Sequence, residues 1–164
     1  MIYQLPHPLD RPGQQAAYDW LISSKKKYLI ICAPTGSGKS AWVAEASKAN
    51  RVIVLTETKS LQSTNYKDSY SFDILYGKSN YSCDENEWWT AFDCGNPDCE
   101  CPYNTAVTRC LDSPRVSLNY AKFLMSSTFI ETYQPDILFL DEAHNLPAIT
   151  MEHIGLTIKW DSEF

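Results

Sequence analysis

The chain has 164 residues, of which 44% are hydrophobic, and its formal net charge at pH 7 is −6. This length predicts one domain, or one domain that carries a small insertion. The hydrophobic content is enough for a core, which excludes a disordered chain. The acidic balance excludes a globally basic nucleic-acid coat protein, although a local basic groove is compatible with it.

No segment predicts a membrane span or a secretory signal. The longest apolar runs, Tyr28–Ala33 and Ile137–Leu140, have the length of strands, far below the roughly 20 residues that a spanning helix needs. The amino-terminal ten residues lack a basic segment followed by an apolar one. We therefore expect an intracellular protein without a membrane partner, whose cysteines are metal ligands or core residues rather than disulfides.

Helices and strands are predicted to alternate along most of the chain. A first helix is expected after Asp10 as N-cap, with Pro12 in its first turn, and the lysines at 25–27 then form a solvated turn. This alternation is typical of a parallel sheet in an α/β domain. The later elements predicted are a strand buried on both faces at Tyr28–Cys32, a helix at Lys39–Ala49, and strands at Arg51–Thr56, Val116–Tyr120 and Asp136–Leu140.

One region breaks this alternation. Residues 79–110 are rich in Cys, Asn, Asp and Trp and show no sustained period, so we interpret them as an insertion between strands. The domain proper would then comprise residues 1–78 and 111–164. Five of the six cysteines lie at the insertion, Cys83, Cys94, Cys99, Cys101 and Cys110, whereas the isolated Cys32 is expected in the core.

A phosphate-binding loop is indicated by Ala33–Ser40, which reads APTGSGKS between a predicted strand and a predicted helix. This is the Walker A arrangement. Its glycines let successive N–H groups point at phosphate oxygens, and the following helix adds its positive amino-terminal end. Lys39 would reach the β and γ phosphates of ATP, and the Ser40 hydroxyl would ligate Mg²⁺.

The second half of a nucleotide site is indicated by Ile137–His144, which reads ILFLDEAH. An apolar strand that ends in two acids is a Walker B pattern. Asp141 would hold Mg²⁺, and Glu142 would orient and deprotonate the attacking water. Lys39, Asp141 and Glu142 are thus the predicted catalytic residues.

Further short segments accompany these two motifs. In chain order they are RPGQ at Arg11–Gln14, TETKSLQ at Thr56–Gln62, GKSNYSC at Gly77–Cys83, CPY at Cys101–Tyr103 and LNY at Leu118–Tyr120. Together with APTGSGKS and DEAH, and in this order, they resemble the XPD/DinG-type iron–sulfur helicases of superfamily 2. The resemblance covers nearly the whole chain and implies the amino-terminal portion of an ATP-dependent DNA helicase with a RecA-like P-loop NTPase fold.

The resemblance also implies which residues bind nucleotide. Gln14 would contact the adenine, and His144 would link the ATP site to neighbouring motor elements. The implied nucleotide-binding set is Arg11, Gln14, Pro34, Thr35, Gly36, Ser37, Gly38, Lys39, Ser40, Asp141 and His144.

Carried over by position, the implied cluster ligands are Cys83, Cys94, Cys99 and Cys101. Four thiolates suit a [4Fe–4S] cluster, and their spacing is a poor match to the paired knuckles of structural zinc sites. Zinc and unmetallated thiols stay open as alternatives. Cys110 is interpreted as a packing residue and is the reserve ligand, because two ligands in a Cys-x-Cys pair are close together.

The insertion carries six acidic and two basic residues between Lys78 and Cys110, so it is expected to repel DNA phosphates rather than grip them. Trp88, Trp89 and Phe92 are expected to pack the insertion, with stacking on bases as the alternative.

The resemblance implies single-stranded or forked DNA and a second RecA-like motor domain, in cis or in trans, as partners. It places the protein in the cytoplasm of a prokaryote or a virus-infected cell, or in a eukaryotic nucleus. Such a second domain supplies arginine fingers, so this chain by itself is expected to hydrolyse ATP slowly. The alternative function is a non-catalytic module that binds nucleotide, DNA or a partner protein.

Overall fold

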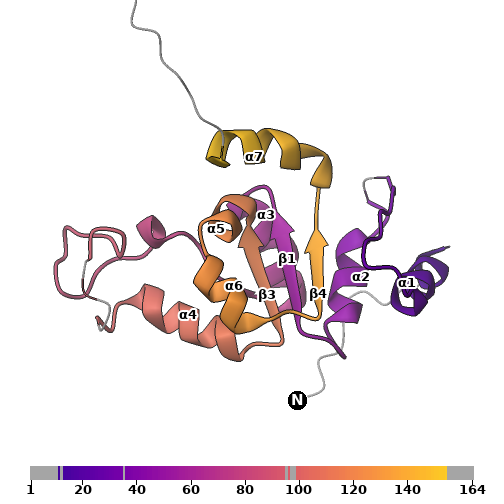
Figure 1. Ribbon diagram of the computed structural model, residues 1–164. Coiled ribbons are helices and arrows are strands. Elements are labelled where there is room, and N and C mark those ends of the chain that lie inside the picture. Colours follow the sequence, from indigo (N-terminus) through magenta and orange to yellow (C-terminus); the bar gives the residue numbers. More distant parts are fainter. Residues whose placement is uncertain (1–10, 12, 35, 95, 97–98, 155–164) are drawn as a thin grey trace, which may run out of the picture.

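The computed structural model of the chain describes residues 11, 13–34, 36–94, 96 and 99–154 (Figure 1). Its helices are α1 Gln14–Ser23, α2 Lys39–Ala46, α3 Lys59–Leu61, the π-helix η1 Gln62–Asp68, the 3₁₀ turn η2 Lys78–Asn80, α4 Pro102–Asp112, α5 Tyr120–Leu124, α6 Ser127–Tyr133, the 3₁₀ turn η3 Ala143–Asn145 and α7 Leu146–Ile154. Its strands are β1 Val52–Thr56, β2 Asp73–Ile74, β3 Arg115–Asn119 and β4 Ile137–Leu140.

The four strands form one parallel sheet in the order β2-β3-β1-β4. In its register, Val54 of β1 lies opposite Ser117 of β3 on one side and Phe139 of β4 on the other. All five residues of β1 are buried, as expected for a central strand covered on both faces. The predicted α/β class, and the strands predicted near residues 51, 116 and 136, are confirmed.

Side chains of β1 alternate between two apolar layers. Ile53 and Leu55 pack in the cluster that includes residues of α4 and α6, whereas Val52 and Val54 pack against α2 and Tyr66 of η1. Helices therefore cover both faces of the sheet, and in Figure 1 α2 and α4 lie on opposite sides of it. Helix α7 lies beyond the carboxyl ends of the strands, where β4 ends and residues 141–145 begin (Figure 1).

The predicted strand at Tyr28–Cys32 is wrong. The segment has no regular secondary structure and no ladder pairing, Ile30 is 93% exposed, and Cys32 is exposed rather than in the core. An apolar run becomes a strand only where a neighbour pairs with its backbone. Among the described residues β4 pairs on one edge alone, with β1, and its residues are half-buried or exposed in alternation.

The predicted insertion contains two kinds of structure. Residues 81–94, 96 and 99–101, which we call the cysteine loop, have a single antiparallel bridge between Ser82 and Thr90 in their described part. Helix α4 follows, and its Ala106 and Cys110 belong to the same buried cluster as β3. Cys110 is therefore a packing residue, as predicted. Helix α4 therefore packs with the sheet although it lies inside the predicted insertion. The insertion boundary at residue 110 stays a prediction.

The aromatic residues of the cysteine loop do not pack as expected. Trp88 is 86% exposed, and Trp89 and Phe92 are also exposed. The loop gathers its cysteines inward instead and leaves these rings in solvent. None of the helices in the described ranges is long and apolar enough to cross a membrane.

Candidate functional site

The glycine loop lies between the irregular segment at residues 28–34 and α2. Gly36 and Gly38 have φ values of 76° and 87°, a left-handed conformation that favours glycine. A Cβ at Gly38 would also overlap the Gln14 side-chain amide, so a side chain there would have to displace that amide from the loop. Helix α2 then begins at Lys39, which puts Lys39 and Ser40 in its first turn.

Two residues of the RPGQ segment brace this loop. The Gln14 amide, which is buried, donates to the Ser37 carbonyl at 2.7 Å and accepts from the Arg11 backbone N–H at 3.1 Å. The Arg11 guanidinium donates to the Gly36 carbonyl. Both ends of the Gln14 side chain are thus engaged with protein, so here it positions the loop. Its predicted contact with adenine stays a prediction.

The acidic pair lies at the carboxyl end of β4. Glu142 has a φ of 53°, a left-handed conformation that costs a non-glycine residue on the order of 1 kcal/mol. This turn brings its carboxylate to 3.8 Å from the Lys39 ammonium and 3.4 Å from His144 Nδ1. Lys39 also donates to the Ala33 carbonyl at 3.3 Å. The fold therefore joins two motifs that are far apart in the sequence.

Asp141 is held more tightly than its neighbour. Its backbone N–H donates to Leu55 of β1 at 2.9 Å, and its carbonyl accepts from the Tyr120 hydroxyl at 2.9 Å. Its side-chain Oδ2 accepts from the Tyr66 hydroxyl at 2.9 Å. Sequence analysis missed both tyrosines. Tyr66 lies in no motif and reaches Asp141 from η1, across 75 positions of sequence, whereas Tyr120 belongs to the LNY segment, which does not itself predict a contact with Asp141.

A cavity of about 410 Å³ opens between the glycine loop and the acidic pair. The Ser37 hydroxyl is buried without a hydrogen-bond partner in the described part of the chain, as expected beside a binding site for a polar ligand. Pro34 precedes the loop, and the predicted site residue Thr35 lies outside the described residues. The lining residues are Arg11, Gly36, Gly38, Lys39, Ser40, Leu61, Asn65, Ser69, Tyr70, Asp141 and Glu142.

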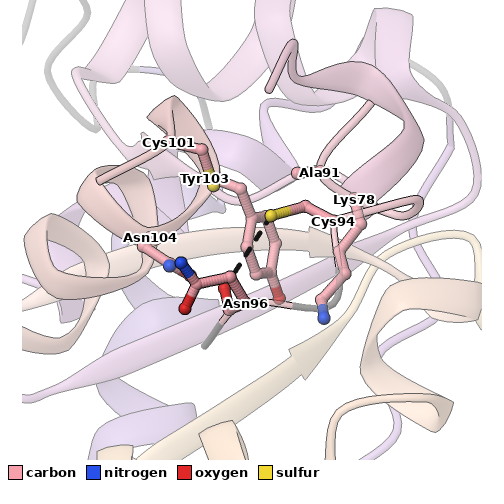
Figure 2. A pocket seen from close by; sticks show the side chains of 7 residues that line it. All are labelled: Lys78, Ala91, Cys94, Asn96, Cys101, Tyr103 and Asn104. Carbon is pink, nitrogen blue, oxygen red and sulfur yellow. Dashed lines mark hydrogen bonds between the residues drawn. The ribbon is translucent and has the colours of Figure 1, made fainter. Parts of the chain in front are cut away.

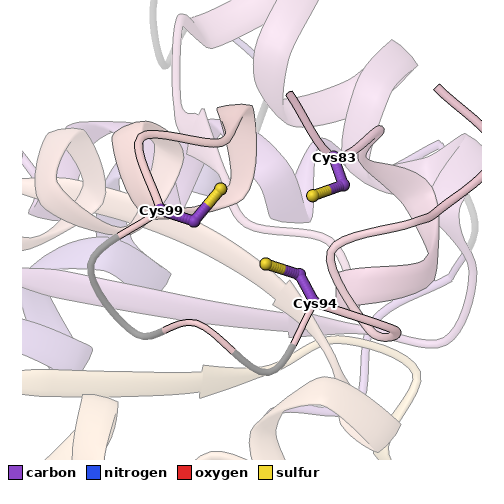
Figure 3. A group of neighbouring side chains, drawn as sticks. All are labelled: Cys83, Cys94 and Cys99. Atoms are coloured by element: carbon purple, nitrogen blue, oxygen red, sulfur yellow. The ribbon is translucent and has the colours of Figure 1, made fainter. Parts of the chain in front are cut away.

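A second group of functional side chains lies in the cysteine loop. The Sγ atoms of Cys83, Cys94 and Cys99 all lie within 4.8 Å of one another and point toward a common centre (Figure 3). Cys83 is fixed by its N–H, which donates to the Trp89 carbonyl at 2.9 Å. The structure thus brings together three of the four predicted cluster ligands.

The fourth predicted ligand, Cys101, is buried in the same small cluster as Cys83, Ala91 and Cys99. Its sulfur is not part of the group of three. Cys101 and Cys94 line a neighbouring cavity of about 140 Å³ together with Lys78 and Tyr103 (Figure 2). Cys101 immediately precedes α4 as its N-cap residue.

Electrostatics separate the cysteines. Burial opposes ionisation of Cys83, but hydrogen bonds from the backbone at Glu85 and Asn86 outweigh it and lower its pKa. Burial raises the pKa of Cys99 to about 12, with the neighbouring cysteine thiols adding to the shift. Burial also raises the pKa of Cys110 to about 12, in keeping with its place in the core. The pKa shifts of Cys83 and Cys99 are thus opposite in direction, although the two sulfurs lie within 4.8 Å of each other.

Comparisons of the chain with protein-family models, with curated proteins and with solved structures give no match.

Proposed function

We propose that this chain is the first, RecA-like motor domain of an ATP-dependent DNA helicase, with a metal cluster held by its cysteine loop. The observation that carries the proposal is the convergence of Lys39 and Ser40 with Asp141 and Glu142 around one cavity. A lysine in the first turn of a helix, opposite two acids at the end of a parallel strand, is the arrangement by which P-loop NTPases hold a nucleotide and Mg²⁺.

The roles of the residues follow from their chemistry. Backbone N–H groups of the glycine loop and the start of α2 would hold phosphate oxygens. The Lys39 ammonium would exchange its ion pair with Glu142 for one with these oxygens and neutralise their charge. Ser40 and Asp141 would ligate Mg²⁺, which neutralises phosphate charge when bound. Glu142 would then be free to orient a water molecule and accept its proton, while His144, 3.4 Å away, holds the carboxylate in place.

For the cysteine loop we propose a [4Fe–4S] cluster. Three thiols that share a centre fit a thiophilic metal, and Cys101, buried in the same small cluster, is the proposed fourth ligand. Cys83, Cys94, Cys99 and Cys101 would hold the cluster. Zinc is the alternative outcome, and analysis of iron, acid-labile sulfide and zinc in anaerobically purified protein distinguishes them.

The proposed partners are single-stranded or forked DNA and a second RecA-like motor domain. In such a motor, closure of the second domain over ATP supplies the arginine finger, worth about 10³–10⁵ in rate in well-studied phosphoryl-transfer systems. We therefore expect the chain alone to bind nucleotide with little turnover. Robust DNA-stimulated hydrolysis by the chain alone would exclude the alternative, a non-catalytic binding module.

The decisive test compares two lysines of the same helical segment. Lys39 faces the cavity, whereas Lys48 lies just beyond α2 in an exposed ion pair with Glu45. We expect Lys39→Ala to weaken binding of Mg·ADP by about 10–100-fold, the value of a charge-assisted hydrogen bond, and Lys48→Ala to leave it within about twofold. Isothermal titration calorimetry measures both. Equal affinities for the two variants, or no binding by the unmodified chain, would overturn the proposal.

A further inference from the structure

Tyr66 is a buried side chain that contacts one of the proposed magnesium ligands. Its hydroxyl donates to Asp141 Oδ2 at 2.9 Å. The side chain is completely buried and packs in the apolar cluster that contains Ala41 of α2. Tyr66 therefore joins the first turns of α2 to the end of β4.

An unusual backbone puts the hydroxyl there. Tyr66 belongs to the π-helix η1, a rare conformation that frequently marks functional sites. The ring packs edge-on against Phe72 with centroids 5.4 Å apart, and the Phe72 N–H donates to the Tyr66 carbonyl at 3.0 Å. The ring is thus fixed from two directions, which leaves the hydroxyl little freedom to move.

The contact with Tyr66 occupies one of the two oxygens of the Asp141 carboxylate. Oδ2 is occupied by Tyr66, whereas no other side chain in the described part of the protein hydrogen-bonds to the carboxylate. Burial and the nearby Asp141 charge keep the pKa of Tyr66 well above its ordinary value, so the phenol remains a donor. A carboxylate held at one oxygen keeps the other for a cation, which is how ligating carboxylates are commonly oriented.

We propose that Tyr66 is a positioning residue for Mg²⁺, which orients Asp141 before the cation and the nucleotide bind. The inference rests on the proposed nucleotide site and adds a residue that no sequence motif marks. Its specific consequence concerns the metal: Tyr66 should govern how much Mg²⁺ strengthens nucleotide binding, and should matter little for nucleotide bound without metal.

The test measures ADP affinity with Mg²⁺ and with EDTA, in the unmodified chain, in Tyr66→Phe and in Tyr133→Phe. Tyr133 is a matched control, because it is equally buried and its hydroxyl donates to Ser113 and Val52 carbonyls, distant from Asp141. Mg²⁺ strengthens ADP binding by a certain ratio, and we expect Tyr66→Phe to reduce that ratio about tenfold, which is the value of a hydrogen bond to a charged group. Its affinity in EDTA should stay within about twofold, and Tyr133→Phe should change neither.

A double-mutant cycle separates positioning from a general loss of structure. If Tyr66 acts through Asp141, Tyr66→Phe should have no further effect on Mg²⁺ dependence in an Asp141→Asn background. If Tyr66→Phe folds poorly, 3-fluorotyrosine placed at position 66 keeps the shape of the side chain. It should still change the Mg²⁺ concentration at which ADP binding is half strengthened.

Three results would overturn the inference: unchanged Mg²⁺ dependence in Tyr66→Phe, an equal loss in Tyr133→Phe, or an effect that persists in Asp141→Asn. Each of these leaves nucleotide binding itself in place. Failure of the unmodified chain to bind ADP under any condition would instead overturn the proposed function, and this inference with it.

Discussion

Asp141 and Cys94 belong to the two candidate sites and are held in different ways. The Asp141 backbone hydrogen-bonds to β1, and two buried tyrosines fix its carbonyl and its carboxylate. Cys94 lies in a loop whose described part has one isolated bridge, and its sulfur makes a weak 3.8 Å contact with the Asn96 carbonyl. Pairing across the sheet therefore holds the nucleotide site, whereas the three sulfurs of the cysteine loop are brought together by short-range backbone hydrogen bonds, such as that of Cys83 with Trp89.

The largest effect is expected from removing a cysteine of the group. Cys83→Ser should lower bound metal by roughly tenfold or more, because structural metal sites draw their stability from a complete ligand set. Metal analysis and limited proteolysis of the cysteine loop measure the effect. Cys32→Ser is the matched control, since Cys32 is exposed and outside the group. Equal metal content in both variants would show that the thiols hold no metal.

Substitution of one tryptophan in the α/β domain and one in the cysteine loop compares how much each region contributes to stability. Trp42 of α2 is 7% exposed, whereas Trp88 of the cysteine loop lies almost entirely in solvent. We expect Trp42→Ala to cost about 3–5 kcal/mol of unfolding free energy and Trp88→Ala less than about 0.5 kcal/mol. Urea denaturation measures both. A cost for Trp88→Ala similar to that of Trp42→Ala would mean that the loop packs its aromatic rings after all.

Glu142 offers a smaller change at the nucleotide site. The Glu142 backbone is in the left-handed conformation, with φ 53°, which glycine adopts more easily than other residues. We therefore expect the free energy of unfolding of Glu142→Gly to exceed that of Glu142→Gln by about 0.5–1 kcal/mol. Both variants lose the ion pair with Lys39, so their difference isolates the backbone term. A glycine variant no more stable than the glutamine variant would contradict the strained turn.

The smallest effect concerns Lys122, where the regions meet. Its ammonium donates to the Tyr103 hydroxyl at 2.7 Å, and burial, then the nearby Lys78 charge, lower its pKa to about 8. In the unfolded chain Lys122 keeps its proton up to about pH 10.5. Burial of the charged ammonium therefore costs folding free energy in full below pH 8, and this cost disappears between pH 8 and 10.5.

Stability should therefore rise with pH across that window, by a few degrees in melting temperature at most, since Lys122 is partly solvated. Lys122→Met should remove this rise, as differential scanning fluorimetry at pH 7.5, 9 and 10.5 would measure. A rise of the same size in Lys122→Met would assign it to other groups.

Sequence reasoning succeeded where local pattern and fold agree. The glycine loop, the start of α2 and the acidic end of β4 follow from short motifs, and β1, β3 and β4 from apolar runs with partners on the sheet. It failed at Tyr28–Cys32, where the same kind of run has no pairing neighbour in the described chain. Burial depends on what lies across the edge of a strand, which composition does not reveal.

Tertiary contacts explain the remaining differences. Tyr66 reaches Asp141 across 75 positions of sequence, so no local spacing could announce it. Trp88 and Phe92 have the composition of a core but lie in a loop too small to enclose them once the cysteines face inward. The convergence of Cys83, Cys94 and Cys99 was predicted from a family resemblance, and the structure supports it with three sulfurs.

The most direct test of the account is hydrogen–deuterium exchange of the unmodified chain with and without Mg·ADP. The account predicts slower exchange in two separate segments, residues 36–42 and 139–144, and unchanged exchange at residues 83–94. Protection of only one of the first two segments, or of the cysteine loop instead, would contradict the claim that distant motifs form a single nucleotide site.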